Sequence, residues 1–345
     1  MANFSKKLLA RPETANAEVL HRIAVAKTRV QSILDRERVS HQKTLEQKIS
    51  DQGPMGMRVD PHLVGLAIMD LLELNRLKTV HHKETGNHPW YANILTPQPV
   101  IDERLKVLAP LYQSTLGSFS NLVGDALEIV TEKCLAAVQT GSGRYAYQGH
   151  FMLDQPKDKH GRYAKTQPPK SINSSQTNKE ADFLQFGYES GAVCIECKNY
   201  REWIYPHNPV VKELIVKSVE LECIPLLVAR RIHYTTRENL FKPAGILFHE
   251  TLYQYYPLDF DELTQKVKDK TLLGFSDVRA TQDPDKRTVE FFASYMPKIV
   301  DSTAALWSKN KAALLAYTQD QLNLFQLYQE IGSPGAAKTA KEVPF

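Results

Sequence analysis

Two stretches of strand-forming residues around one tight turn constrain the fold more than any other part of the chain. Phe183 to Tyr188 and Ala192 to Cys197 are rich in aromatic and β-branched residues. Between them, Glu189-Ser190-Gly191 is typical of a three-residue hairpin loop with glycine at the left-handed position. The segment therefore predicts two antiparallel strands.

The length of this loop also predicts the register of the hairpin. With three residues in the loop, Tyr188 is expected opposite Ala192, which places Asp182 opposite Lys198. Because side chains alternate between the two faces of a strand, Glu196 and Lys198 share a face with Asp182. The pattern predicts two carboxylates and one ammonium group at the same end of the strand pair.

This combination of charges favours a metal site. Carboxylates a few ångströms apart resist ionising together unless a cation neutralises them. Asp182, Glu196 and the carbonyl of Cys197 would form an incomplete set of oxygen ligands, which suits a hard divalent ion that keeps water ligands. We therefore expect Mg²⁺ or Mn²⁺ on Asp182 and Glu196, with Lys198 orienting and activating a metal-bound water for attack on phosphorus.

These residues resemble a known family. Asp182, thirteen intervening residues and then Glu196-Cys197-Lys198 is similar to the D…(D/E)-x-K core of the PD-(D/E)XK nuclease superfamily, with Ala181 where the family often has proline. The resemblance implies an α/β, restriction-endonuclease-like core in the order α-β-β-β-α-β. It also implies a metal-dependent endonuclease that hydrolyses DNA, with a role in restriction, antiviral defence or repair.

The neighbouring sequence predicts elements in that order. Ser114 to Gln139 has helical spacing, and Arg144 to Leu153 alternates as a first strand. Asn208-Pro209 is a helix start signal for a helix to about Glu222. The apolar run Ile224 to Ala229 predicts a strand that is covered on both faces, and Ala244 to Phe248 is a further candidate.

The resemblance adds two candidate residues on these helices. The family often has a metal-binding acid on its first helix, which here would be Glu128, although an ordinary solvated helix acid is the alternative. The second helix of the family often directs a Gln or Lys to the site. Lys212 is the candidate, and an exposed helix lysine is the alternative.

Basic residues near the predicted site are candidates for contacts with a phosphate backbone. Arg230 and Arg231 directly follow the last core strand. Residues 154–179 form a long polar segment that includes Lys165. Its basic side chains would hold nucleic acid beside the site, and a simple flexible insertion is the interpretation left open.

The amino-terminal part predicts a separate domain. Residues 18–38, 39–49 and 60–77 have helical patterns, and residues 78–83 and 90–95 are typical of two strands. Three helices followed by a hairpin is similar to a winged-helix arrangement, which can bind DNA or another protein.

The sequence therefore predicts four regions. They are a helical and winged-helix-like domain at 1–98, a nuclease domain at 110–260, a helical extension at 261–331 and a disordered tail at 332–345, with a linker at the prolines of residues 96–99. The terminal helices could bind a protein partner. Cutting both strands of DNA with one site per chain would suggest a homodimer.

Composition excludes some classes of protein. Among 345 residues, 42% are hydrophobic and 24% charged, as in soluble globular proteins. No apolar run approaches the roughly 20 residues of a membrane span, and the amino terminus lacks a signal-peptide hydrophobic region, so we expect a cytoplasmic protein without membrane contact. The net charge of +4 is compatible with DNA as partner. The alternative function is a non-catalytic DNA-binding or scaffold subunit of a larger nucleic-acid-processing complex.

Overall fold

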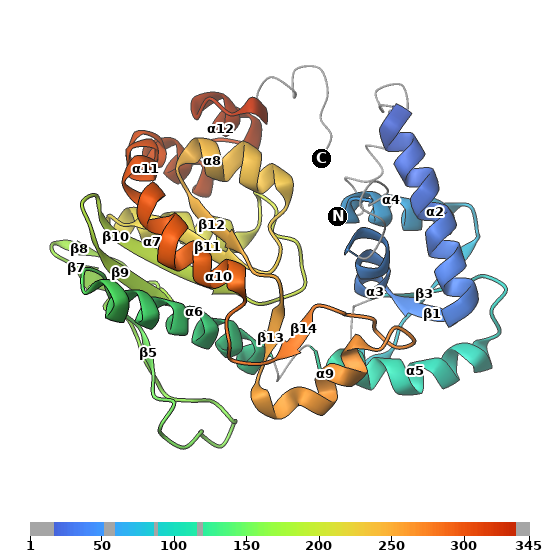
Figure 1. Ribbon diagram of the computed structural model, residues 1–345. Helices are drawn as coiled ribbons and strands as arrows, with labels where there is room; N and C mark the ends of the chain where they lie inside the picture. Colours follow the sequence, from blue (N-terminus) through green and yellow to red (C-terminus); the bar gives the residue numbers. More distant parts are fainter. Residues whose placement is uncertain (1–16, 52–58, 86–88, 116–119, 336–345) are drawn as a thin grey trace. The chain divides into compact units, whose positions relative to one another are not determined.

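The computed structural model describes residues 17–51, 59–85, 89–115 and 120–335 and shows a mixed α/β chain (Figure 1). Its contacts define two units. The first comprises Met1–Phe119 and Glu262–Val278, and the second comprises Ser120–Asp261 and Arg279–Phe345. The segment expected as one helical extension, 261–331, is thus divided between the units.

The first unit combines helices with a small antiparallel sheet in the order β1-β3-β2. Its elements up to residue 115 are α2 (Ala17–Glu37), β1 (Val39–His41), α3 (Gln42–Glu46), a π-helical turn (Gln47–Asp51), α4 (Pro61–Glu73), β2 (Leu77–Val80), a 3₁₀ turn (Lys83–Thr85), β3 (Trp90–Asn93) and α5 (Gln98–Gln113). The three predicted helices and both predicted strands are present. The expected wing residues 86–88 lie outside the described part.

Two predictions for this unit are wrong in detail. Residues 39–49, expected to be wholly helical, begin with β1, because Arg38 adopts a left-handed φ of 72° that ends α2 and turns the chain into a strand. Pro97, expected in a linker, is the N-cap of α5, so a helix of the same unit follows it directly.

The second unit is built on a five-stranded mixed sheet in the order β12-β11-β10-β9-β4. Strands β4, β9 and β10 pair antiparallel, whereas β10, β11 and β12 pair parallel. The bounds are β4 (Ala146–Gln148), β9 (Phe183–Tyr188), β10 (Gly191–Lys198), β11 (Ile224–Ala229) and β12 (Leu247–Glu250). All six residues of β11 are buried, as expected for a strand covered on both faces.

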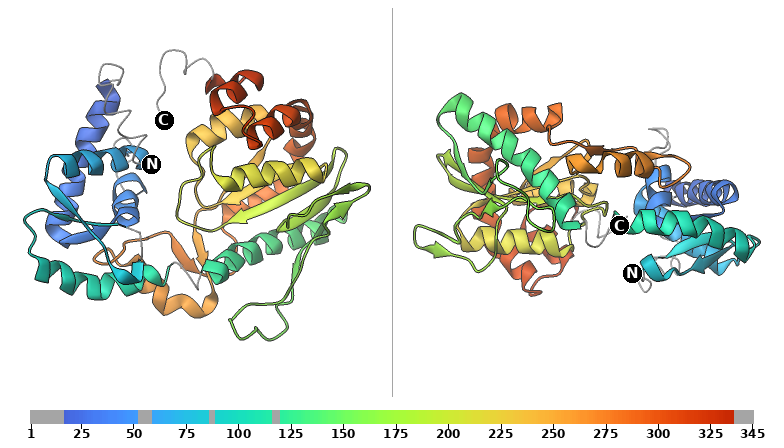
Figure 2. Two further views of the ribbon diagram at one scale, coloured as in Figure 1. Left: turned by 180° about the vertical axis from the view of Figure 1, so that it is seen from behind. Right: turned by 90° about the horizontal axis from the view of Figure 1, so that it is seen from below.

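Helices α6 (Ser120–Ser142) and α7 (Pro209–Glu220) cover opposite faces of this sheet (Figure 2). The Cys197 thiol lies 3.4 Å from the Thr131 hydroxyl on α6, whereas the preceding residue, Glu196, forms an ion pair with Lys217 on α7. Adjacent strand residues point to opposite faces. The expected order of helix, three strands, helix and strand is therefore present as α6, β4, β9, β10, α7 and β11.

The boundaries of these elements differ from the expected ones at two places. α6 begins at Ser120 rather than Ser114, and residues 116–119 lie outside the described part. The strand expected over 144–153 is divided into β4 and β5 (His150–Phe151) at Gly149, whose φ is 106°. A side chain at Gly149 would bring its Cβ to 2.6 Å from the carbonyl oxygen of Asp182, so this position requires glycine.

The remaining elements surround the sheet or lie in the connections. The polar segment 154–179 contains short strands, and α11 with α12 forms the carboxyl-terminal helical part. The bounds are β6 (Lys165–Thr166), β7 (Ser171–Ile172), β8 (Ser175–Gln176), a π-helical turn (Thr235–Phe241), α8 (Lys242–Ala244), β13 (Gln254–Tyr256), a 3₁₀ turn (Leu258–Phe260), α9 (Asp261–Lys268), β14 (Val278–Ala280), α10 (Lys286–Glu290), a π-helical turn (Phe291–Tyr295), α11 (Met296–Thr318) and α12 (Leu324–Glu330).

The start of the expected disordered tail is ordered, because the Ser333 amide donates to the carbonyl of Tyr328 at 2.8 Å. Residues 336–345 lie outside the described part. None of the described helices is both long and apolar enough to cross a membrane.

Candidate active site

The β9–β10 hairpin has a different register from the expected one. Tyr188 pairs with Gly191 instead of Ala192, and the register shifts once more before Ile195 pairs with Phe183. The turn is therefore one residue shorter than predicted. Continuing the pairing beyond Phe183 places Asp182 beside Glu196 rather than Lys198, and the Asp182 amide donates to the Ile195 carbonyl at 3.1 Å. A slip of two residues keeps every side chain on its predicted face.

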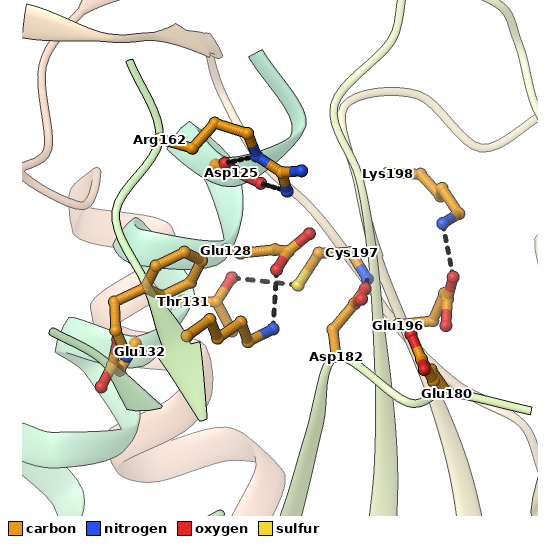
Figure 3. A network of polar contacts seen from close by, with 12 residues as sticks. Asp125, Glu128, Thr131, Glu132, Arg162, Glu180, Asp182, Glu196, Cys197 and Lys198 are labelled. Atoms are coloured by element: carbon orange, nitrogen blue, oxygen red, sulfur yellow. Dashed lines mark hydrogen bonds and ion pairs between the residues drawn. The ribbon is translucent and has the colours of Figure 1, made fainter. Parts of the chain in front are cut away.

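Three carboxylates gather where β10 ends (Figure 3). Asp182 directly precedes β9, Glu196 lies near the end of β10, and Glu128 comes from α6. Burial raises the pKa of the Asp182 carboxyl to about 8, and the negative charges of Glu196 and Glu128 contribute to the increase. Asp182 thus lies near enough to both Glu196 and Glu128 for their charges to act on it.

Glu196 is held between two lysines. Its side chain is 6% exposed; one carboxylate oxygen pairs with Lys198 and the other with Lys217 on α7. Burial favours protonation of Glu196, but the two ammonium groups outweigh it and leave its pKa below the ordinary value. Glu196 is therefore ionised at neutral pH.

The two lysines stay protonated. Burial alone would lower their pKa values, but the attraction of Glu196 and the additional negative charge of Asp182 raise both above the ordinary value. Lys198 can therefore donate hydrogen bonds or compensate negative charge at neutral pH. It has no lone pair with which to accept a proton from water.

Asp182 has a different environment. One of its carboxylate oxygens accepts the Cys197 amide at 2.6 Å. Among the described residues, no lysine, arginine or histidine forms an ion pair with Asp182. Its raised pKa reflects burial first and then the negative charges of Glu196 and Glu128, which Lys198 and Lys165 offset only in part. A cation bound beside Asp182 would ionise the carboxyl.

Glu128 is paired with a lysine from the polar segment. Lys165 Nζ lies 2.7 Å from a Glu128 carboxylate oxygen and 4.4 Å from the centre of the Phe183 ring. One turn earlier on α6, Asp125 accepts two hydrogen bonds from Arg162, at 2.7 and 2.8 Å. Two ion pairs thus attach the segment that contains Lys165 to α6. Lys165 also lies near enough to Asp182 for its charge to lower the pKa of that carboxyl.

The end of β10 is fixed by Asn199. Its buried side-chain amide donates to the carbonyl of Val123 on α6 and, at 2.6 Å, to that of Tyr255 on β13. Its oxygen accepts the Tyr255 amide at 3.1 Å. These bonds hold Lys198, the preceding residue, in a fixed position relative to Glu128 on α6.

Other predicted residues lie away from the acids. Lys212 pairs with Asp320 at 2.5 Å and its ammonium lies 5.1 Å from the centre of the Tyr317 ring, so it does not contact the cluster. Arg230 is 1% exposed, which contradicts the expectation of a surface phosphate contact. Arg231 is partly exposed, and its guanidinium donates to the Arg230 carbonyl at 3.2 Å.

Lys217 is the residue that the sequence analysis missed. It follows the buried Leu214 by three residues, so both lie on the side of α7 that faces the sheet. Lys212 follows the buried Val211 by one residue and therefore points about 100° away from it. The spacing of the apolar residues along α7 could therefore have identified Lys217 as a lysine that faces the sheet.

The donor atoms at the site are of the type that binds hard divalent ions. Asp182, Glu196 and the Cys197 carbonyl supply oxygen, and Asp182, whose raised pKa keeps it largely protonated at neutral pH, would ionise beside a bound cation. In the described part of the chain, no three His, Cys, Asp or Glu side chains are grouped as a metal site. Lysines already neutralise the charges of Glu196 and Glu128. The residues therefore fit a hard ion by the type of their donor atoms, and an ion would have to compete with these lysines.

No family model, curated protein or solved structure matches the chain. The resemblance to the PD-(D/E)XK nucleases therefore depends on Asp182, Glu196 and Lys198 and on the order of the elements that carry them.

Proposed function

We propose that this protein is a metal-dependent endonuclease that hydrolyses DNA phosphodiester bonds, with a restriction-endonuclease-like core in the second unit. The observation that supports it best is the meeting of Asp182, Glu196 and Lys198 at the end of β10, in a sheet covered by α6 and α7. This position, at the carboxyl end of a parallel strand, is typical of ligand sites in α/β folds.

Asp182 and Glu196, with the Cys197 carbonyl, would hold Mg²⁺ or Mn²⁺, and Glu128 would be a further ligand. The ion would activate a water molecule and neutralise charge on the phosphate. Lys198, as an ammonium group, would orient the water and stabilise the negative charge that develops on phosphorus oxygens. Lys217 would keep Glu196 ionised and correctly directed.

The first unit supports DNA as the substrate. Helices α2, α3 and α4 and the sheet β1-β3-β2 have the composition expected for a winged-helix domain, which would grip the duplex. Cleavage of both strands would use a homodimer. We propose restriction, defence against foreign DNA or repair as the biological setting, in the cytoplasm.

Cleavage of supercoiled and linear DNA by wild type and Lys198→Ala tests the proposal. Mg²⁺, Mn²⁺ and a chelator are compared, and Lys212→Ala is the matched control because its side chain does not contact the acids. Metal-dependent cutting by wild type and Lys212→Ala, lost in Lys198→Ala, supports the nuclease. Equal cutting by both variants contradicts the role of Lys198.

A second function is favoured by the ion pairs of the site. Lysines already neutralise Glu196 and Glu128, an arrangement that is also suited to a scaffold without a metal. A non-catalytic DNA-binding or scaffold subunit would bind DNA equally well with and without Mg²⁺. Absence of cutting under every condition, with DNA binding retained in Lys198→Ala, supports this function instead.

A further inference from the structure

A group of aromatic and histidine side chains follows the ends of two parallel strands. Trp203, Tyr205 and His207 come after β10, and His233 and Tyr234 come after β11. These five residues are the aromatic cluster. Since β10 and β11 run parallel, their carboxyl ends lie at the same edge of the sheet. The acids Asp182 and Glu196 lie at this edge too.

Backbone hydrogen bonds hold the two segments together. The Ile204 amide donates to the Arg231 carbonyl at 3.2 Å, and the His233 amide donates to the Ile204 carbonyl at 3.0 Å. The Thr236 hydroxyl also donates to the Ile204 carbonyl, at 2.8 Å. The loop after β10 is fastened further on, because the Tyr317 hydroxyl donates to the Pro206 carbonyl at 3.1 Å. The rings are therefore held on a fixed backbone.

The rings form one continuous surface around His233. Tyr205 stacks on His233 with centroids 4.4 Å apart, and Trp203 meets His233 edge-on at 6.1 Å. Tyr234 lies 5.0 Å from His233, and His207 stacks on Tyr205 at 5.8 Å.

The centre of the cluster is buried and its rim faces solvent. His233 is buried, whereas Tyr234 is 39% exposed, His207 is exposed and both Trp203 and Tyr205 are partly exposed. A cluster that served only as core would bury its large rings on all sides. Here His207 and Tyr234 are exposed at the rim, and Trp203 and Tyr205 are exposed in part.

The aromatic cluster is close to the acids along the chain. Four residues lie between Lys198 and Trp203. The five steps along the chain span at most about 18 Å when extended. Tyr200, between them, lies near enough to Lys198 and Glu196 for their charges to influence its pKa, which burial raises to about 12. The partly exposed Arg201 and Arg231 flank the same segments and add positive charge.

We propose that the aromatic cluster stacks unpaired nucleobases of a nucleic-acid strand whose backbone reaches the acids. Every base has an aromatic face, so such stacking tolerates any sequence, and arginines beside it attract the backbone. Bases in an intact duplex are stacked on each other and cannot use these rings. This inference rests on the proposed function and specifies its substrate: DNA with unpaired nucleotides next to the bond that is cut.

Tryptophan fluorescence tests this inference without cleavage. The chain has three tryptophans, and Trp90 and Trp307 are buried, so a stacked base should quench Trp203. The probes are oligo-thymidylate and a blunt duplex of equal length, in the presence of a chelator. We expect the single strand to quench Trp203 and the duplex to leave its fluorescence nearly unchanged.

Matched variants identify the rings. Tyr234→Leu and Trp203→Leu should each weaken single-strand binding about tenfold. Fluorescence anisotropy of a labelled strand measures this binding. Trp203→Phe should retain most of it. Tyr295→Leu is the control, because Tyr295 is exposed and lies outside the cluster. Circular dichroism checks that each variant folds. If Trp203→Leu does not fold, Tyr234→Leu still tests the inference, because Tyr234 is exposed.

The outcomes distinguish failure of the base-stacking inference from failure of the proposed nuclease function. Unchanged single-strand binding in Tyr234→Leu and Trp203→Leu, or equal quenching of Trp203 by duplex and single strand, overturns base stacking whether or not wild type cuts DNA. Quenching of Trp203 in wild type, together with weaker single-strand binding by anisotropy in Tyr234→Leu and Trp203→Leu, supports it, even where plasmid cleavage fails and the proposed nuclease function is abandoned.

Discussion

Lys217 on α7 and Glu196 on β10 form a buried ion pair, and Lys217 also donates to the carbonyl of Glu180 at 2.7 Å. Lys217 is 3% exposed. The pair joins a helix on one face of the sheet to the strand that carries Lys198. It therefore determines how Glu196 is directed at the candidate active site.

Replacing Lys217 should destabilise the fold. Lys217→Met leaves one oxygen of a buried carboxylate without its cation, which should lower the free energy of unfolding by about 3 kcal/mol. Urea denaturation measures the change. Lys212→Met is the control: its pair with the exposed Asp320 should contribute about 1 kcal/mol or less. Equal losses in the two variants contradict the importance of the buried pair.

Stability should fall as the pH rises past the ordinary pKa of an aspartate. The Asp182 carboxyl has a pKa of about 8 in the folded protein and a lower one when unfolded. The folded state therefore binds more protons between about pH 4 and pH 8, and raising the pH through this range disfavours it. Asp182→Asn should remove this contribution.

Thermal unfolding of wild type and Asp182→Asn in a chelator, from pH 5 to pH 8, measures this effect. The variant should gain stability relative to wild type as the pH increases. Parallel curves for the two proteins would show that Asp182 is ionised at pH 7 without a metal.

Divalent ions should reverse this pH dependence. An ion on Asp182 and Glu196 displaces the proton from Asp182, so its binding should strengthen as the pH rises. Mg²⁺ or Mn²⁺ should increase the melting temperature of wild type more at pH 8 than at pH 6. Asp182→Asn and Glu196→Gln should lose most of the increase. An increase that both variants retain would place the ion elsewhere.

Gly149 should be intolerant of a side chain. Gly149→Ala introduces a Cβ 2.6 Å from the Asp182 carbonyl at a φ of 106°, and should cost about 3 kcal/mol or more. Gly191→Ala is the control, because Gly191 has a similar φ of 113° but open space around it. The difference between their unfolding free energies isolates the cost of the close contacts at Gly149, of which the Asp182 carbonyl oxygen is the nearest and the Phe183 ring, at 2.9 Å, the next. No difference contradicts the close approach.

Local sequence patterns predicted which residues of β9 and β10 form the site, but they did not predict the contacts between distant segments. The alternation of β9 and β10 placed Asp182, Glu196 and Lys198 on one face, and an error of two residues in register left that face unchanged. One residue of the error arose because Gly191, expected in the loop, already pairs with Tyr188, and the other because the register shifts between Gly191 and Val193.

Three features depend on contacts between distant segments. Lys165 reaches Glu128 across 37 residues of chain, and nothing in the polar segment distinguishes it from the lysines around it. β1 has three residues, too few for a periodic pattern, and forms because β3 pairs with it. Arg230 is a buried arginine at a strand end, where the sequence suggested a surface residue.

The most direct test of the central claim is the rate of plasmid nicking in Mg²⁺ by wild type and Asp182→Asn. Asparagine keeps the size of Asp182 and an oxygen for the Cys197 amide but removes the charge that would hold the ion. We predict nicking by wild type and a loss of about 100-fold or more in the variant. Equal rates, or no nicking by wild type with Mg²⁺ or Mn²⁺, would contradict a metal-dependent nuclease centred on Asp182.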